Sequence, residues 1–302
     1  KAAILHEMWG DEEEPDATIQ TLIRETSFQD SSLAHDILGT PESIQHTQLS
    51  HVRNFWEQQY VANNLIISVA GHFQEEHLLA LVDQYAGQWR TGPAQRNATE
   101  QKPLLPRRRV KVNAHLQQQF FALALPAVPR HDPDYTAALL GTRVLEMRLY
   151  WSILHLGLAE DLEVNLWTDA YDIVHQANIL TIEANTLPEL VPTVLEKIQR
   201  ELKHVLEDGV TEAELRRAKN MRQCGRVIAS EEMLERAWTL AEQWDFEGRV
   251  FSVDEELARI EQVSCEDVMR AFHRFSSFER QVLVSTGPLE DEAFTCHAPP
   301  PP

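Results

Sequence analysis

The stretches IQHTQLSHVRNFWEQQYVANNLIISVAGHF (residues 44–73) and IEQVSCEDVMRAFHRFSSFERQVLVSTGPL (residues 260–289) align without a gap at a shift of 216 (260 − 44). Identity is low, but both stretches show a helical pattern, then an apolar strand pattern, then a glycine, Gly71 in one and Gly287 in the other. In the first copy, NLIISVAG is expected to form a buried strand. A helix pair precedes each stretch, so the chain is predicted to contain a repeated unit.

The whole pattern of helices and strands predicts an α+β fold made of two repeated α/β sandwich halves. Residues 1–92 are assigned to the first half, 93–109 to a linker without periodicity, 110–290 to the second half and 291–302 to a disordered tail. With a shift of 216, the first half is expected to be truncated at its N-terminus by on the order of a hundred residues. One continuous α+β domain with a long linker is the alternative.

Composition narrows the class of protein. The chain has 302 residues, of which 43% are hydrophobic, so it can form a sizeable core. Its formal net charge of −20 argues against a nucleic-acid partner, because such a surface repels phosphates. The three cysteines form no CxxC, which is typical of a reducing compartment and predicts a cytoplasmic protein. The apolar runs are too short to span a bilayer, so no membrane partner is expected.

Five segments, taken in order, carry a resemblance to a known family. They are ILHEMWGDEEEPDA (4–17), FQDSSLAHDILGTPESI (28–44), FWEQQYVANNLIISVAGHF (55–73), GTRVLEMRLYWSILHLGLAEDLEV (141–164) and GVTEAELRRAKN (209–220). Together they resemble the pitrilysin/insulinase-like zinc metallopeptidases, of the small bacterial and mitochondrial-processing-peptidase type. The resemblance covers roughly residues 1–289 and implies the metallopeptidase type of fold, with two similar halves around a chamber.

The resemblance also implies a zinc site. In this family an H-x-x-E-H motif supplies two histidine ligands and a general-base glutamate, and a distant glutamate is the third ligand. The position of that third ligand corresponds here to Glu7. No H-x-x-E-H occurs in the 302 residues, and the family places it upstream of the Glu7 position. It is therefore expected in a segment before Lys1, or else the protein is a degenerate relative.

The residues around Glu7 leave two interpretations open. On a helical wheel Glu7 falls between Ala3 and Ile4, away from the solvent face, so its carboxylate must be paired or ligated. A helix-end salt bridge is the alternative to a metal ligand. The repeat pairs Glu7 with Gln223, which suggests a site in the first copy only. Neighbouring His6 is expected to be exposed, and three tryptophans are expected in the core, namely Trp151, Trp238 and Trp244.

A second departure from the family concerns substrate binding. Relatives that clamp a peptide carry Arg and Tyr where this sequence has Ile153 and Glu160. The resemblance therefore implies the zinc-bearing subunit of a heterodimer that hydrolyses peptides in an enclosed chamber, with a related subunit supplying the clamp. Arg143 or Arg148, with Tyr150, could take the clamp positions in another register. The alternative function is a non-catalytic structural or interaction subunit of the same fold.

Overall fold

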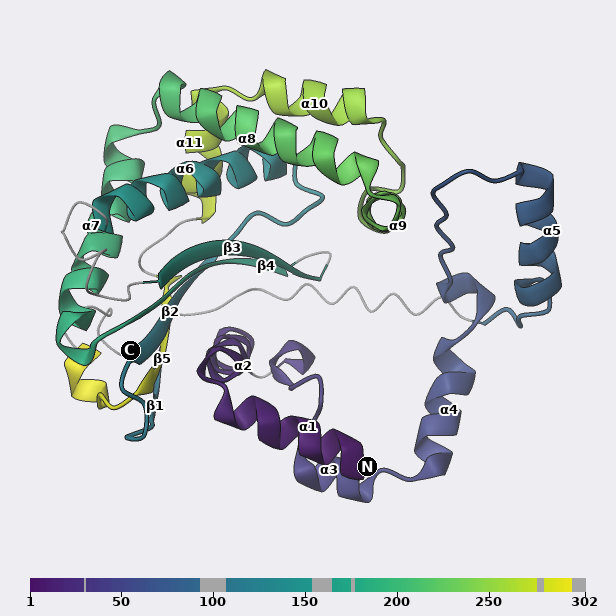
Figure 1. Ribbon diagram of the computed structural model, residues 1–302, viewed down its shortest axis with the longest axis horizontal. Coiled ribbons are helices and arrows are strands. Elements are labelled where there is room, and N and C mark those ends of the chain that lie inside the picture. The colour runs from purple at the N-terminus through teal and green to yellow at the C-terminus, as the bar shows by residue number, and fades with distance from the viewer. Residues whose placement is uncertain (30, 93–106, 154–164, 175–176, 276–279, 295–302) are drawn as a thin grey trace.

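The computed structural model describes residues 1–29, 31–92, 107–153, 165–174, 177–275 and 280–294 (Figure 1). The predicted tail and most of the predicted linker lie outside these residues, apart from the 3₁₀ turn Asp291–Phe294 (η6). The predicted α+β fold is confirmed: helices cover both faces of a five-stranded sheet. None of the described helices combines the length and apolar character that crossing a bilayer requires.

The first part of the chain contains helices and short 3₁₀ turns. They are α1 (Ala2–Glu13), α2 (Pro15–Ser27), η1 (Ser32–Ala34), α3 (Pro41–His46), α4 (Leu49–Gln59), η2 (Ala62–Asn64) and α5 (Glu75–Ala86). The sheet strands are β1 (Arg107–Val112), β2 (Gln119–Pro126), β3 (Asn165–Val174), β4 (Ala177–Thr186) and β5 (Val282–Gly287). The remaining elements are α6 (Tyr135–Ile153), η4 (Pro188–Leu190), α7 (Val191–Asp208), α8 (Glu212–Glu231), α9 (Met233–Glu247), α10 (Val253–Gln262) and α11 (Cys265–Phe275). Strand β1 includes Arg107 to Arg109, which the sequence predicts to be part of the linker.

The sheet order is β1-β5-β2-β4-β3, with β1 parallel to β5 and the other pairs antiparallel. Successive side chains of a strand point to opposite faces, so β2 contributes to two cores. Phe121 and Leu123 face the larger core, beneath α6, α7, α8 and α11. Ala122 and Ala124 face the other core, which α2 covers with buried Ile19, Leu22, Ile23 and Phe28. Helix α2, from the first part of the chain, therefore covers one face of the sheet that the second part forms.

Helix α1 continues through Gly10 to Glu13. Glycine inside a helix costs only about 1 kcal/mol relative to alanine, and a side chain at Gly10 would meet open space. The break comes at Pro15, which occupies the first turn of α2. Proline disfavours helical geometry in the residue before it, and Glu14 is accordingly extended.

The predicted repeat is visible in the helices. Helices α4 and α11 have bounds that differ by 216 residues at both ends. At the same shift α1 falls within α8, and α2 overlaps α9. Gly71 (φ 138°) and Gly287 (φ 151°) share a backbone conformation that favours glycine. The two copies thus share a helix order and a terminal turn.

The prediction of a buried strand at NLIISVAG is wrong for this structure. Residues 65–70 form no strand, and Leu65, Ile66, Ile67 and Val69 are exposed. The equivalent strand β5 lies between β1 and β2, whereas no described strand pairs with residues 65–70. A strand needs hydrogen-bonding partners on its edges, so the sequence pattern alone cannot form one.

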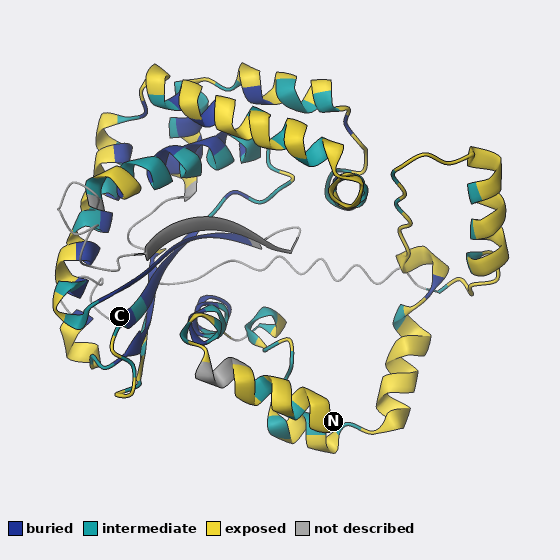
Figure 2. Ribbon diagram, viewed as in Figure 1, coloured by how far each residue is buried: buried dark blue, intermediate teal, exposed yellow. Residues whose placement is uncertain are grey.

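Helix α4 shows the same contrast with its equivalent α11. Val52 and Trp56 are 55% and 57% exposed, whereas the equivalent Val268 and Phe272 are 0% and 4% exposed. Figure 2 shows α4 and α5 exposed along most of their length, unlike α6 and α11. The apolar face of α4 therefore has the composition of a core helix without the packing of one.

Helix α9 is also uncovered, so the prediction that its tryptophans are core residues is wrong. Trp238 is 65% exposed, whereas its equivalent in α2, Leu22, is 4% exposed against the sheet. Trp244 is likewise exposed, as is Trp151 on α6. Helix α9 contacts the segment equivalent to β5, because the Ser68 hydroxyl donates to the Ala237 carbonyl at 2.7 Å. The apolar residues of α4, residues 65–70 and α9 are together called the uncovered surface.

The Glu214 carboxylate links the first turn of α8 to α6. Arg148 of α6 donates to both oxygens of Glu214 at 2.6 and 2.8 Å, and Glu214 also accepts from the backbone and hydroxyl of Thr211. The Arg148 hydrogen bonds, reinforced by those from Thr211, lower the pKa of Glu214 to about 2. A lowered pKa stabilises the fold above the unfolded-state value, and this contribution is lost as pH falls from about 4.5 toward 2.

We therefore expect Glu214→Gln to destabilise the chain near neutral pH and to lose that effect in acid. The difference in free energy of unfolding between wild type and variant should shrink steadily between about pH 4.5 and pH 2. Urea denaturation at several pH values measures it. The control is Glu196→Gln, which removes an exposed i,i+4 pair with Arg200 and should show little difference at any pH. A pH-independent effect of Glu214→Gln would contradict this account.

Candidate functional site

Glu7 lies in the middle of α1 and is exposed, so the prediction that it faces away from solvent is wrong. Neighbouring His6 is exposed, as predicted. Among the described residues Glu7 has no hydrogen bond or ion pair, so the helix-end salt bridge is not observed there. Its equivalent Gln223 is engaged, since its amide donates to Glu261 and to the Leu257 carbonyl of α10. The first copy thus presents a free carboxylate where the second has a bonded amide.

A zinc site requires three or four ligands, and one carboxylate does not meet that requirement. Within the described part of the chain, no three His, Cys, Asp or Glu side chains lie close enough to hold a metal ion. The described residues therefore do not fit a complete zinc site, and Glu7 could supply only one ligand of it. Its role as a metal ligand stays a prediction.

The clamp positions are only partly described. Ile153 is the last residue of α6, and Glu160 lies outside the described residues. Arg148, an alternative clamp residue, is committed to Glu214 and to the Gly209 carbonyl at 2.8 Å. Tyr150 is exposed and stacks edge-on against Trp151, with ring centroids 5.6 Å apart. These contacts give Arg148 a structural role.

Arg143, the other alternative, forms an ion pair with Glu146 one turn along α6. Its side chain is half-exposed, so the pair contributes little to stability. Neither arginine is brought to a shared site with Tyr150 by a described contact. The described structure therefore does not assemble an Arg/Tyr clamp from α6.

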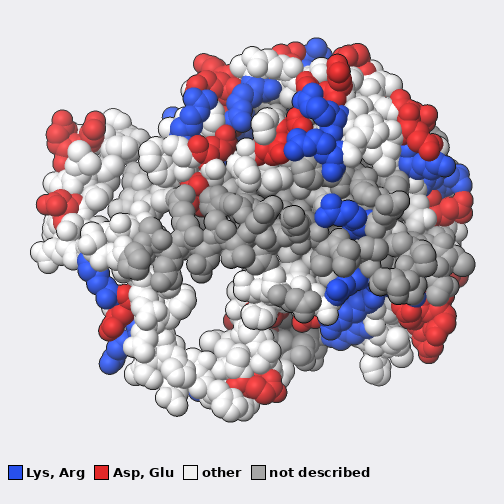
Figure 3. Space-filling view, turned by 180° about the vertical axis from the view of Figure 1, so that it is seen from behind, with Lys and Arg blue, Asp and Glu red and all other residues white. Residues whose placement is uncertain are grey.

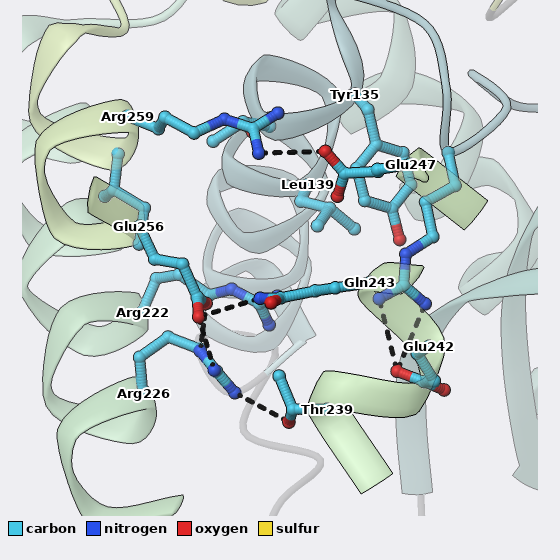
Figure 4. Close-up of a pocket in the computed structure, with 13 residues that line it drawn as sticks. Tyr135, Leu139, Arg222, Arg226, Thr239, Glu242, Gln243, Glu247, Glu256 and Arg259 are labelled. Carbon is cyan, nitrogen blue, oxygen red and sulfur yellow. Dashed lines mark hydrogen bonds and ion pairs between the residues drawn. The ribbon is translucent and has the colours of Figure 1, made fainter. Parts of the chain in front are cut away.

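A cavity of about 310 Å³ lies where α8, α9 and α10 meet the start of α6 (Figure 4). Four arginines and three glutamates line it, and every glutamate has an arginine partner. The pairs are Arg226–Glu256 at 2.6 Å, Arg130–Glu242 at 3.2 Å and Arg259–Glu247 at 3.0 Å. The fourth cation, Arg222, has no hydrogen bond or ion pair with a described residue, and no dashed line reaches it in Figure 4.

The sequence alone does not reveal this cavity. One signal was available, because Arg222 and Arg226 are four residues apart on α8, and like charges at this spacing destabilise a helix. Their counter-charges come from α9 and α10, whose approach no local pattern encodes. Seen from behind, Lys and Arg lie intermixed with Asp and Glu over the helices of the second part (Figure 3).

Comparisons with known proteins agree with this fold. The chain is 27% identical over 97% of its length to an uncharacterized zinc protease of Streptomyces coelicolor, and 25% identical over 88% to one of Mycobacterium bovis. It spans 65% and 61% of the lengths of these relatives. The predicted resemblance to zinc metallopeptidases is thereby confirmed at the level of the family.

Two solved structures share the fold. A chain of Complex III2 from Candida albicans has a TM-score of 0.84 at 17% identity, and covers 96% of this chain and 71% of its own. A peptidase M16 inactive domain from Pseudomonas fluorescens has a TM-score of 0.83 at 20% identity, with 96% and 69% covered. Residues 47–222, more than half of the chain, match the family described as "Peptidase M16 inactive domain". The chain therefore belongs to the peptidase M16 inactive-domain family.

Proposed function

We propose that the chain is part of a zinc-dependent peptidase, in which it belongs to the zinc-bearing subunit of a heterodimer. The observation that carries this proposal is the match of almost the whole chain to relatives named zinc proteases. The free carboxylate of Glu7 supports it, since an exposed glutamate without a partner is available to a metal. The remaining zinc ligands and the general base come from residues outside the 302 printed here.

The uncovered surface supports the proposal that further polypeptide packs against it. Its residues on α4 and in 65–70 are equivalent to buried residues of the second part, where α11 packs under α6 and β5 lies between β1 and β2. Its residues on α9 are equivalent to residues of α2, which is buried against the sheet. The body that covers it therefore contains a sheet and a helix equivalent to these elements. Polypeptide outside the 302 residues supplies this body, either from the same chain or from a partner subunit. The largely uncharged surface around α4 and α5 in Figure 3 suits such burial.

The substrate in this proposal is a peptide enclosed between two related subunits. Ile153 and Glu160 occupy the positions at which the family holds its Arg/Tyr clamp. Isoleucine cannot donate a hydrogen bond, and a glutamate carboxylate repels a carbonyl oxygen that becomes negative. The partner subunit therefore contributes the arginine and tyrosine that hold the peptide.

The test uses the protein purified from its natural source together with any copurified relative. We expect one zinc ion per active site and hydrolysis of unstructured peptides. Glu7→Gln should lose both zinc and hydrolysis, because an amide oxygen is a weaker zinc ligand than a carboxylate. The control Glu196→Gln changes an exposed glutamate on α7 and should retain both. Full zinc content and activity in Glu7→Gln would refute the assignment of Glu7.

A second candidate function is a non-catalytic structural subunit. Two observations favour it: the matched family is described as an inactive domain, and the fold is shared with a chain of Complex III2 from Candida albicans. The same purified protein discriminates the two functions. A stable assembly that contains no zinc and cleaves no peptide would establish the structural role and refute the peptidase.

A further inference from the structure

The cavity between α6, α8, α9 and α10 carries an excess of one positive charge. Four arginines face three glutamates, in a chain whose net charge is −20. Arg222, which has no hydrogen bond or ion pair with a described residue, is exposed, so its guanidinium is open to an anion that enters the cavity. One bound monoanion would balance the excess positive charge of the cavity.

The glutamates of the cavity cannot serve as that anion for Arg222. Glu256 accepts from Nε and Nη2 of Arg226 at 2.6 and 2.9 Å, and its Oε1 also accepts from Gln243 at 2.9 Å. Glu242 accepts from Arg130 and from the Trp238 indole at 2.8 Å. Glu247 is paired with Arg259 at 3.0 Å, so all three carboxylates are occupied by other donors.

Arg222 extends from α8 toward the centre of the cavity, beside Gln243 (Figure 4). The residue is exposed, although the other residues of the cavity partly desolvate its guanidinium. This desolvation lowers the pKa of Arg222, and the nearby charges of Arg226 and Arg130 lower it further, against Tyr135 and Glu256, which raise it. An anion bound at Arg222 would offset the repulsion from Arg226 and Arg130.

We propose that the cavity binds a ligand through one carboxylate, which pairs with the guanidinium of Arg222. A guanidinium presents two parallel N–H donors that match the two oxygens of a carboxylate. Phosphate carries a larger negative charge, which three paired but nearby glutamates oppose. The hydroxyls of Thr136 and Thr239 and the apolar side chains of Leu139 and Ile260 line the remaining space. A volume of about 310 Å³ suits a small organic acid or the carboxyl end of a short peptide.

This inference does not rest on the peptidase proposal, because binding is measured without zinc or cleavage. The probes are acetyl-dialanine with a free carboxyl end, its amide, propionate and inorganic phosphate, titrated by calorimetry into the 302-residue chain. We expect at least one of the two acids to bind with a Kd of about 1 mM or tighter, and the amide to bind at least about tenfold more weakly. Binding of propionate identifies a small-acid site, and binding of only the peptide acid identifies a peptide end.

Three variants make the test specific. Arg222→Gln should weaken binding of the acid about tenfold or more without lowering the melting temperature, because it removes an unpaired charge. Arg222→Lys should bind with intermediate affinity, since it keeps the charge and loses the planar fork. The control Arg200→Gln makes the same charge change on exposed α7 and should bind as wild type.

The proposal is overturned by any of three results. The first is that neither acid binds, or that acid and amide bind alike. The second is unchanged binding of the acid by Arg222→Gln. The third is binding of inorganic phosphate, dependent on Arg222, in the absence of binding by either carboxylate.

Discussion

Phe272→Ala is expected to lower the free energy of unfolding of the 302-residue chain by about 3–5 kcal/mol, whereas Trp56→Ala lowers it by less than about 1 kcal/mol. The two residues occupy equivalent positions in α11 and α4. Phe272 is buried in the larger core beneath α6, so its removal leaves a cavity. Trp56 is exposed, and the ring of Tyr60 stacks on it at 6.4 Å. Urea denaturation followed by circular dichroism measures both values.

A second pair provides the control. Val268→Ala and Val52→Ala delete the same two methyl groups at equivalent positions, one buried and one exposed. The first should be clearly destabilising and the second nearly neutral. In the protein purified with its covering body, Trp56→Ala and Val52→Ala should become as destabilising as their equivalents. Equal effects in the 302-residue chain alone would mean that α4 is already covered.

Gly287→Ala is the second large expected effect, at about 2–4 kcal/mol. Gly287 has φ 151°, and an added Cβ would lie 2.4 Å from Oε1 of Gln119. That side chain is fully buried, donates to the Ser285 hydroxyl at 2.7 Å and accepts from the Leu289 amide at 2.9 Å. The substitution therefore strains the backbone and disrupts two buried hydrogen bonds.

The matched variant is Gly71→Ala, at the equivalent turn with φ 138°. No atom of the described residues lies within 4 Å of an added Cβ there, and no described strand pairs with residues 65–70 to hold them in place. We expect a loss of less than about 1 kcal/mol, because the backbone can relax. Thermal and urea denaturation compare the two variants. A neutral Gly287→Ala would contradict the role given to Gln119.

The sequence alone predicts the repeat because the repeat is encoded locally. The periodic apolar residues of α4 and α11 give both helices the same bounds at a shift of 216. The turns at Gly71 and Gly287 follow from a backbone conformation that only glycine adopts readily. The fold class and the family follow from the order of these elements.

What the sequence does not predict depends on partners distant along the chain. An apolar run becomes a buried strand only when other strands flank it, as β1 and β2 flank β5 but no described strand flanks residues 65–70. Trp238 is apolar and stands at the position equivalent to buried Leu22, yet it is 65% exposed, because no described element packs over it. The cavity at Arg222 depends on counter-charges from α9 and α10, which no spacing along α8 reveals.

Hydrogen exchange at the backbone amides of residues 66–71 tests the central claim most directly. The claim is that strands equivalent to β1, β2 and β4 and a helix equivalent to α6 pack against the uncovered surface. In the protein purified intact from its natural source, these amides should be protected as strongly as those of residues 282–287 in β5. In the 302-residue chain alone they should exchange rapidly. Equally rapid exchange in the intact protein would contradict the claim, because it would show that no strand pairs with this segment.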